Sequence, residues 1–249
     1  MIVRSVMFAV FALAAVAAPA TDSETIRLLI VTGYDHPAHD WKTTTPAIRA
    51  VLEKDPRFEV RVVEDPQRLA MPELADYDVV VLHFMNWQRP GPKADALENL
   101  CGFVRDGKGL VVVHFACGAF AESPEYRQLA GRVWDGKNSH DPRGPFRVEI
   151  LDREHPITRG MESYDTDDEL YICLTGDRPI ENLASARSRV TGQDHPMAFC
   201  CEYGKGRVFH TTLGHDARAI RVPGTAELIR RGSAWAAGRE PVVERSDRR

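Results

Sequence analysis

Short apolar runs alternate with amphipathic segments along the first half of the chain. The runs are typical of buried parallel strands, whose sequences are almost continuously apolar because helices cover both faces of the sheet. Between the runs, apolar residues recur at helical spacing, as at Leu97, Leu100 and Val104. We expect strands at residues 26–32, 58–64, 78–83 and 110–114, and helices that begin near residue 43, follow residue 92 and lie near residues 126–130. This alternation predicts a parallel sheet with right-handed helical crossovers.

The second half of the chain contains more strand-like segments and fewer helical ones. We expect strands at residues 146–151, 170–174, 197–203 and 207–213. A glycine-bearing turn at residues 204–206 joins the last two and predicts a hairpin. A final amphipathic helix should stop at Gly238. No repeat or long linker interrupts the pattern, so the sequence predicts one α/β domain over residues 24–239.

Residues 1–20 are expected to be a cleaved signal peptide. Arg4 gives a positive start, residues 6–16 form an unbroken apolar run, and Ala18-Pro19-Ala20 is a small-x-small cleavage pattern. The run is shorter than the roughly 20 apolar residues that span a bilayer, which argues against an anchor. We therefore expect an exported protein, periplasmic or secreted, without stable membrane insertion. Residues 240–249 mix charges of both signs and are expected to form a disordered tail.

The charge balance and the cysteines exclude several classes of function. The chain has 32 Lys and Arg against 36 Asp and Glu, a formal net charge of −4. A mildly acidic, mixed-charge protein is a poor candidate for binding nucleic acid. The five cysteines are odd in number and lack a CxxC spacing, which argues against a disulfide framework or a zinc–thiolate site.

Histidines occur where predicted strands end. Five of the nine follow an apolar run: His36, His39, His83, His114 and His215. A single histidine is more often structural than functional. However, the carboxyl ends of parallel strands meet at one sheet edge, where open α/β sheets build their sites. We therefore expect at least three of these imidazoles to share a pocket, with His39, His83 and His114 at its core.

Carboxylates accompany these histidines. An acidic segment at residues 165–169 precedes an apolar stretch, and Glu169, directly before that stretch, is expected to point inward as an acid–base group. Asp165 and Asp167 are expected to lie in a solvated turn. The residues expected to be catalytic are His39, His83, His114, Glu169 and His215. The residues expected to contact substrate are Asp35, His36, Trp87, His140, Asp168 and Asp216.

Cys117 is a second candidate for chemistry. It follows a predicted strand at a tight turn, where α/β hydrolases hold a nucleophile. Nothing in the sequence supplies the further histidine and carboxylate that a thiolate mechanism needs, so an inert buried thiol is the favoured interpretation.

Several short motifs occur in an order that resembles one protein family. The motifs are Val31-Thr32-Gly33, residues 107–114, Asp168-Glu169-Leu170-Tyr171, residues 203–208, Leu213-Gly214-His215-Asp216 and residues 231–238. Together they span nearly the whole predicted domain. On these motifs the chain resembles the ThuA-like (trehalose utilisation) family.

The resemblance implies a fold and a substrate class. The fold would be a three-layer α/β sandwich with a mostly parallel, flavodoxin-like sheet of the class I glutamine amidotransferase-like type. In amidotransferases the turn after the central strand carries a catalytic cysteine; here that position falls on Ala116, so glutaminase chemistry is not expected. The family is associated with metabolism of trehalose and related disaccharides, including their 3-keto forms.

We therefore expect an exported enzyme of carbohydrate metabolism that acts on a disaccharide or keto-sugar as a lyase, isomerase or hydrolase. The alternatives are a non-catalytic module that binds a sugar or a partner protein, and a Cys117-dependent hydrolase. Two mechanisms remain open. His39, His83 and His114 are suitable ligands for a divalent metal such as zinc. Metal-free acid–base catalysis would instead use imidazoles that titrate near neutrality.

Overall fold

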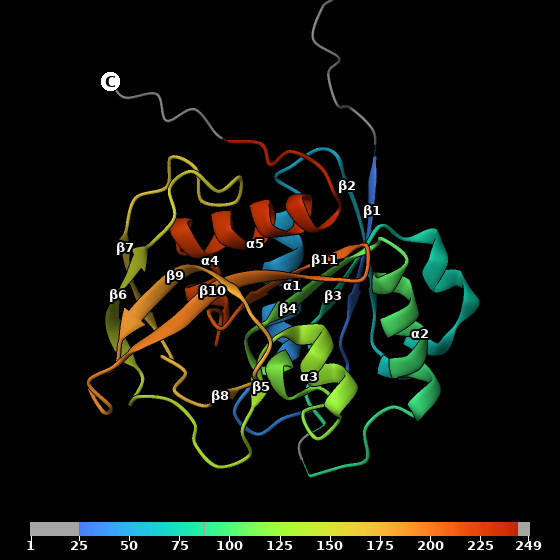
Figure 1. Ribbon diagram of the computed structural model, residues 1–249, viewed down its shortest axis with the longest axis horizontal. Helices are drawn as coiled ribbons and strands as arrows, with labels where there is room; N and C mark the ends of the chain where they lie inside the picture. Colours follow the sequence, from blue (N-terminus) through green and yellow to red (C-terminus); the bar gives the residue numbers. More distant parts are fainter. Residues whose placement is uncertain (1–24, 87, 244–249) are drawn as a thin grey trace, which may run out of the picture.

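The computed structural model describes residues 25–86 and 88–243. The expected signal peptide, Trp87 and residues 244–249 of the expected tail lie outside the described residues. A sheet of nine strands forms the centre of the molecule (Figure 1), in the order β2-β1-β3-β4-β11-β10-β9-β6-β7. Its first five strands pair in parallel: β2 (Phe58–Val63), β1 (Ile26–Val31), β3 (Val79–Leu82), β4 (Gly109–Val113) and β11 (Gly206–Thr211). This is the flavodoxin-like strand order, which confirms the predicted fold class.

The remaining strands extend the sheet in antiparallel pairs. They are β10 (Asp194–Tyr203), β9 (Glu181–Arg187), β6 (Gly144–Ile150) and β7 (Tyr164–Asp168). The predicted hairpin is present, since β10 and β11 pair across the turn at residues 204–205. A separate two-stranded sheet pairs β5 (Val133–Trp134) with β8 (Leu174–Thr175).

Helices cover both faces of the sheet and make it the middle of three layers (Figure 1). One face packs on α1 (Trp41–Leu52), α4 (Ala217–Arg221) and α5 (Pro223–Ala236), and the other on α2 (Ala94–Arg105) and α3 (Pro124–Ala130). In β1, Leu28 and Ile30 contribute to the first core and Leu29 and Val31 to the second. Because successive side chains of a strand point to opposite faces, a strand buried on both faces must be apolar throughout.

Short 3₁₀ segments connect several of these elements. They are η1 (Pro66–Ala70), η2 (Pro72–Asp76) and η3 (His114–Gly118). The η3 segment follows β4 directly and forms part of the candidate site.

Three element predictions were wrong. The acidic segment is itself a strand, β7, while residues 170–173 form no regular strand. Because β7 lies at the sheet edge, Asp165 and Asp167 point to solvent and Asp168 is buried, so the segment lacks an apolar signature. Strand β9 was not predicted, because its centre holds the small residues Ala184, Ser185 and Ala186, which give no strand-like sequence pattern. Helix α1 begins at Trp41, where the Asp40 carboxylate caps it, and not at Thr43.

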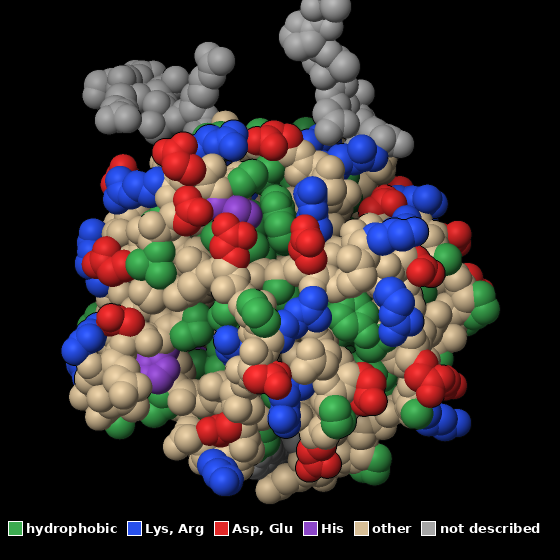
Figure 2. Space-filling model, viewed as in Figure 1, with side chains coloured by type: hydrophobic (Ala, Val, Ile, Leu, Met, Phe, Trp, Pro, Cys, Tyr) green, Lys and Arg blue, Asp and Glu red, His purple; other side chains and the backbone are tan. Residues whose placement is uncertain are grey.

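The described residues include no helix long and apolar enough to cross a membrane. Acidic and basic side chains are interspersed over the face drawn in Figure 2. All five cysteines lie in the described part and are free thiols.

Candidate functional site

The turn after the central strand β4 holds a strained histidine. His114 follows Val113 directly and has a φ of 51°, a left-handed conformation that side chains with a Cβ rarely adopt. The ring is held on both sides: Nδ1 donates to the Thr212 carbonyl at 2.6 Å, and Nε2 lies 2.9 Å from the Tyr171 hydroxyl. Strain of this kind concentrates at functional sites. The strained residue is thus His114. Ala116, which corresponds to the catalytic cysteine position of amidotransferases, lies two residues later and has no such conformation.

The loop between β1 and α1 brings two further histidines to the same edge. It begins at Gly33, whose φ is 116° and where a Cβ would lie 1.9 Å from the Glu64 carbonyl oxygen, so only glycine fits. The loop then carries His36 and His39 before Asp40 caps α1. The two rings lie 4.6 Å apart. The His39 ring also lies 4.9 Å from the His114 ring, so the carboxyl ends of β1 and β4 place their histidines together.

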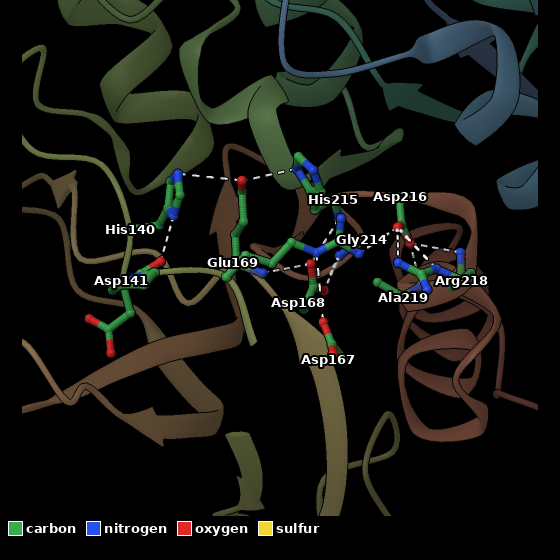
Figure 3. A network of polar contacts seen from close by, with 12 residues as sticks. His140, Asp141, Asp167, Asp168, Glu169, Gly214, His215, Asp216, Arg218 and Ala219 are labelled. Atoms are coloured by element: carbon green, nitrogen blue, oxygen red, sulfur yellow. Dashed lines mark hydrogen bonds and ion pairs between the residues drawn. The ribbon is translucent and has the colours of Figure 1, made fainter. Parts of the chain in front are cut away.

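Glu169 is the centre of the cluster. Its Oε2 lies 3.1 Å from His215 Nδ1 and 3.5 Å from His114 Nε2, and its Oε1 lies 3.3 Å from His140 Nε2. Figure 3 shows the carboxylate between the rings of His140 and His215. The carboxylate is largely buried, with a side-chain exposure of 8%. Four residues remote in sequence thus bring imidazole nitrogens and one carboxylate together.

The main chain holds His140 beside this carboxylate. Residues 139–141 run antiparallel to residues 170–172, with Asp141 N donating to Leu170 O and Ile172 N donating to Ser139 O. His140 Nδ1 lies 2.6 Å from the Asp141 carbonyl oxygen. Because a carbonyl can only accept, Nδ1 carries the proton and Nε2 faces Glu169.

Asp168 fixes the main chain of two members of the cluster, Glu169 and His215. It is fully buried, and its carboxylate accepts hydrogen bonds from the backbone N–H groups of Glu169 at 2.9 Å, Gly214 at 2.7 Å and His215 at 3.0 Å (Figure 3). Burial raises the pKa of Asp168, and the three N–H groups act against that rise. The end of β7 is thereby tied to the segment that follows β11. Asp168 positions the site and does not line the pocket.

His39 completes a group of four potential metal ligands. Its ring stacks on Phe115 at 4.7 Å and lies 4.9 Å from the ring of His114 and 5.1 Å from that of His215. Its Nδ1 is buried and has no hydrogen-bond partner. Burial and the neighbouring imidazoles hold the pKa of His39 far below its usual range. His39, His114, Glu169 and His215 each offer one ligand atom, and these atoms lie within 4.8 Å of one another.

A pocket of about 420 Å³ opens over this cluster. His39 and Glu169 line it, whereas the fully buried His114 and the partly buried His215 do not. Aromatic and apolar side chains form part of the lining, and polar groups of one loop form another part. The remaining lining residues are His36, Pro37, Ala38, Met85, Phe115, Cys117, Trp134, Lys137, Asn138, Ser139, His140, Tyr171 and Cys173. Its size and mixed lining are typical of sites for small molecules.

The pKa values of Glu169 and Cys117 are shifted in opposite directions. Burial alone would raise the pKa of Glu169, but its polar contacts with His114 and His215 and their charges outweigh burial and hold the pKa well below its usual range. Contact with Cys173 and burial raise the pKa of Cys117 well above its usual value. Glu169 is therefore an anion at neutral pH, and Cys117 stays a thiol. A nucleophilic cysteine needs the reverse.

His83 is not brought into the cluster. It is fully buried, with Nδ1 2.9 Å from the Thr45 hydroxyl and Nε2 3.3 Å from the Thr44 hydroxyl, both on α1. Burial lowers the pKa of His83 to about 3. Its ring contacts Phe115, but it neither lines the pocket nor belongs to the group of potential ligands. His83 links β3 to α1 beneath the site.

Of the residues expected to contact substrate, His36 and His140 line the pocket. Asp35 is exposed and pairs with Lys42 at 2.9 Å, and Asp216 caps α4 and pairs with Arg143, so neither lines it. Trp87 lies outside the described residues. Sequence reasoning missed Tyr171 and Phe115. Tyr171 ends the motif at residues 168–171, which was the available signal for it.

The comparisons with known proteins agree with this architecture. A family model described as trehalose utilisation (ThuA) matches residues 27–236. A ThuA-like protein from Parabacteroides merdae superposes with a TM-score of 0.78 at 24% identity, covering 88% of this chain and 93% of that one. A second from Bacteroides uniformis gives 0.68 at 20% identity, covering 89% and 95%.

Part of a larger enzyme has the same fold. A β-galactosidase from Bacillus circulans sp. alkalophilus gives a TM-score of 0.57 at 15% identity over 89% of this chain and 32% of that one. No curated protein matches the sequence significantly. The family match extends over most of the chain and includes the residues of the histidine cluster. The chain belongs to the trehalose utilisation (ThuA) family.

Proposed function

We propose that this protein is an enzyme of carbohydrate metabolism that acts on a disaccharide or its keto derivative in the pocket over Glu169. The observation that carries the proposal is the convergence of His39, His140 and Glu169 on one pocket that also has aromatic walls. Family membership supports a carbohydrate as the substrate. Aromatic faces pack against the apolar faces of sugar rings, and polar groups at the rim bind hydroxyls.

His140 is the proposed acid–base residue. Its Nδ1 donates to the Asp141 carbonyl, so in the neutral ring Nε2 is free to accept a proton. Glu169 lies 3.3 Å from that nitrogen and stabilises the imidazolium that forms. In a keto-sugar, the carbonyl acidifies the C–H bond beside it. His140 Nε2 takes that proton while the electron pair of the C–H bond passes into the enolate, a step common to elimination and isomerisation.

Turnover assays with trehalose, related disaccharides and their 3-keto forms test this proposal. His140→Gln should lower kcat by about 100-fold or more with little change in KM, because the base is lost and the pocket is kept. His195→Gln, at a histidine that does not line the pocket, is the matched control and should retain activity. Unchanged kcat in His140→Gln would reject His140 as the base.

The two alternatives give different results in the same assays. A binding module would bind a disaccharide in calorimetry without converting any of these sugars. A cysteine hydrolase would lose all turnover in Cys117→Ser. The raised pKa of Cys117 is the observation that disfavours the hydrolase.

We also propose that the enzyme is exported, on the sequence of residues 1–20. Cell fractionation of the full-length chain, with mass spectrometry of the recovered protein, tests this. Recovery in the cytoplasm with residues 1–20 still attached would contradict it.

A further inference from the structure

We propose that His39, His114, Glu169 and His215 bind one divalent first-row transition-metal cation at the inner end of the pocket. A role of this ion in catalysis rests on the proposed function, but its binding is measurable without any substrate. The proposed set replaces His83 of the expected triad with Glu169 and His215.

The geometry of the four ligands supports a shared ion. Their donor atoms lie within 4.8 Å of one another, and bonds of about 2.0–2.2 Å to a cation would require only small side-chain movements. His39 Nδ1 is buried without a hydrogen-bond partner. His215 Nδ1, although 3.1 Å from Glu169 Oε2, also lacks an aligned hydrogen bond. Buried polar atoms are nearly always paired, so the unpartnered His39 Nδ1 in this cluster indicates a missing partner.

The charge around Glu169 points the same way. In the described residues, every ion pair of Glu169 is with a histidine, so no Lys or Arg side chain competes with a metal ion for this carboxylate. A buried carboxylate is costly without a cation beside it. Three imidazoles and one carboxylate form a donor set that suits zinc and its neighbours in the first transition row.

The surrounding hydrogen bonds hold the ligands in place. His114 Nδ1 donates to the Thr212 carbonyl, which leaves Nε2 as the ligand atom. A cation would then replace the Tyr171 hydroxyl as the partner of that nitrogen. Asp168 fixes the main chain of Glu169 and His215. Such partners of metal ligands set ligand orientation and metal affinity.

The ion and His140 would have separate tasks. His140 does not belong to the ligand group and faces the same pocket, so it stays free to transfer a proton. The cation would polarise the carbonyl oxygen of a keto-sugar and stabilise the negative charge that develops there.

Zinc binding to the chelator-treated, full-length protein tests the proposal. The measurements are bound zinc after dialysis by elemental analysis, affinity by calorimetry, and the visible spectrum with Co²⁺ in place of zinc. We expect a tightly bound ion that His39→Gln and His215→Gln each remove or weaken by about 100-fold or more. Circular dichroism establishes that each variant is folded. Because His39 and His215 lie in different loops, the test still stands if one of the two variants fails to fold.

His155→Gln is the matched control, because His155, Glu181 and Cys200 form a second group of potential ligands. The ion should remain in this variant. The proposal is overturned if no zinc binds tightly, if both cluster variants bind it like the parent protein, or if only His155→Gln loses it. A protein that binds the ion but converts no sugar would leave the metal site standing and reject the proposed function. Full turnover by a chelated, metal-free protein would reject the catalytic role of the ion and leave the proposed function standing.

Discussion

The Asp168 carboxylate accepts a 3.0 Å hydrogen bond from the backbone N–H of His215, 47 residues further along the chain. In the strand order, β7 and β11 are separated by β10, β9 and β6, yet their ends meet at this bond. The contact is therefore the point at which the antiparallel part of the sheet returns to the edge that carries the histidines. It places Glu169 beside His114.

Asp168→Asn should destabilise the protein and displace Glu169. The amide nitrogen of asparagine would face a backbone N–H that now donates to a carboxylate oxygen, at a cost of about 1–3 kcal/mol. Thermal and denaturant unfolding measure the loss, and kcat should fall with it. Asp165→Asn, on the exposed side of the same strand, is the control and should change stability by less than about 0.5 kcal/mol. Equal effects of the two substitutions would contradict the role assigned to Asp168.

The left-handed conformation of His114 predicts an unusual order of stabilities. His114→Gly and His114→Ala both remove the ring and should both abolish turnover. The glycine variant should nevertheless be more stable by about 1–2 kcal/mol, because alanine keeps a Cβ in a conformation that disfavours it. Urea unfolding of the two variants measures the difference. An alanine variant as stable as the glycine variant would show that the turn relaxes when the ring is removed.

His210 should make stability depend on pH. Its ring is fully buried against Phe199, and burial lowers its pKa from 6.5 to about 4. His210 takes up a proton near pH 6.5 in the unfolded chain but only near pH 4 in the folded protein. Its contribution to the free energy of unfolding is therefore complete above pH 6.5 and is lost as the pH falls toward 4. His210→Phe should remove up to about 3 kcal/mol of this pH dependence. Unfolding curves from pH 7 to pH 4 measure it, and parallel pH profiles for parent and variant would contradict the prediction.

Cys117 should react slowly with alkylating reagents in the native protein. It is buried, and contact with Cys173 helps to keep it protonated. Mass spectrometry after iodoacetamide treatment at neutral pH should find Cys117 and Cys173 unmodified under conditions that fully label the denatured chain. Rapid labelling of Cys117 ahead of the other cysteines would revive the hydrolase alternative.

The parallel part of the sheet was predictable because its strands are buried on both faces and therefore apolar throughout. The antiparallel part was less so. Strand β7 lies at an edge and carries alternating acidic residues, and β9 is built around Ala184, Ser185 and Ala186, which are small enough to give no strand pattern. Their burial depends on neighbours that are distant in sequence, which local patterns do not reveal.

The sheet edge that carries the site was also predictable, because histidines directly follow the apolar runs and so mark the carboxyl ends of the strands. The pattern did not reveal to which side each ring would turn. His83 and His114 both follow apolar strands, but His83 turns to the hydroxyls of α1 while the left-handed turn directs His114 to Glu169. Glu169 does point inward, as predicted, and its backbone N–H is held by the buried Asp168 beside it. The catalytic, substrate-binding and metal roles stay predictions.

The cluster is assembled from residues near positions 39, 114, 169 and 215, which span most of the described chain. No fragment that ends before β11 contains the full set, and local folding of either part of the sheet alone does not bring the set together. The proposed activity and metal binding should therefore appear only after the segment that follows β11 has folded against the rest of the sheet. A polypeptide that is still being synthesised, or that is cleaved before His215, would therefore lack the complete proposed site.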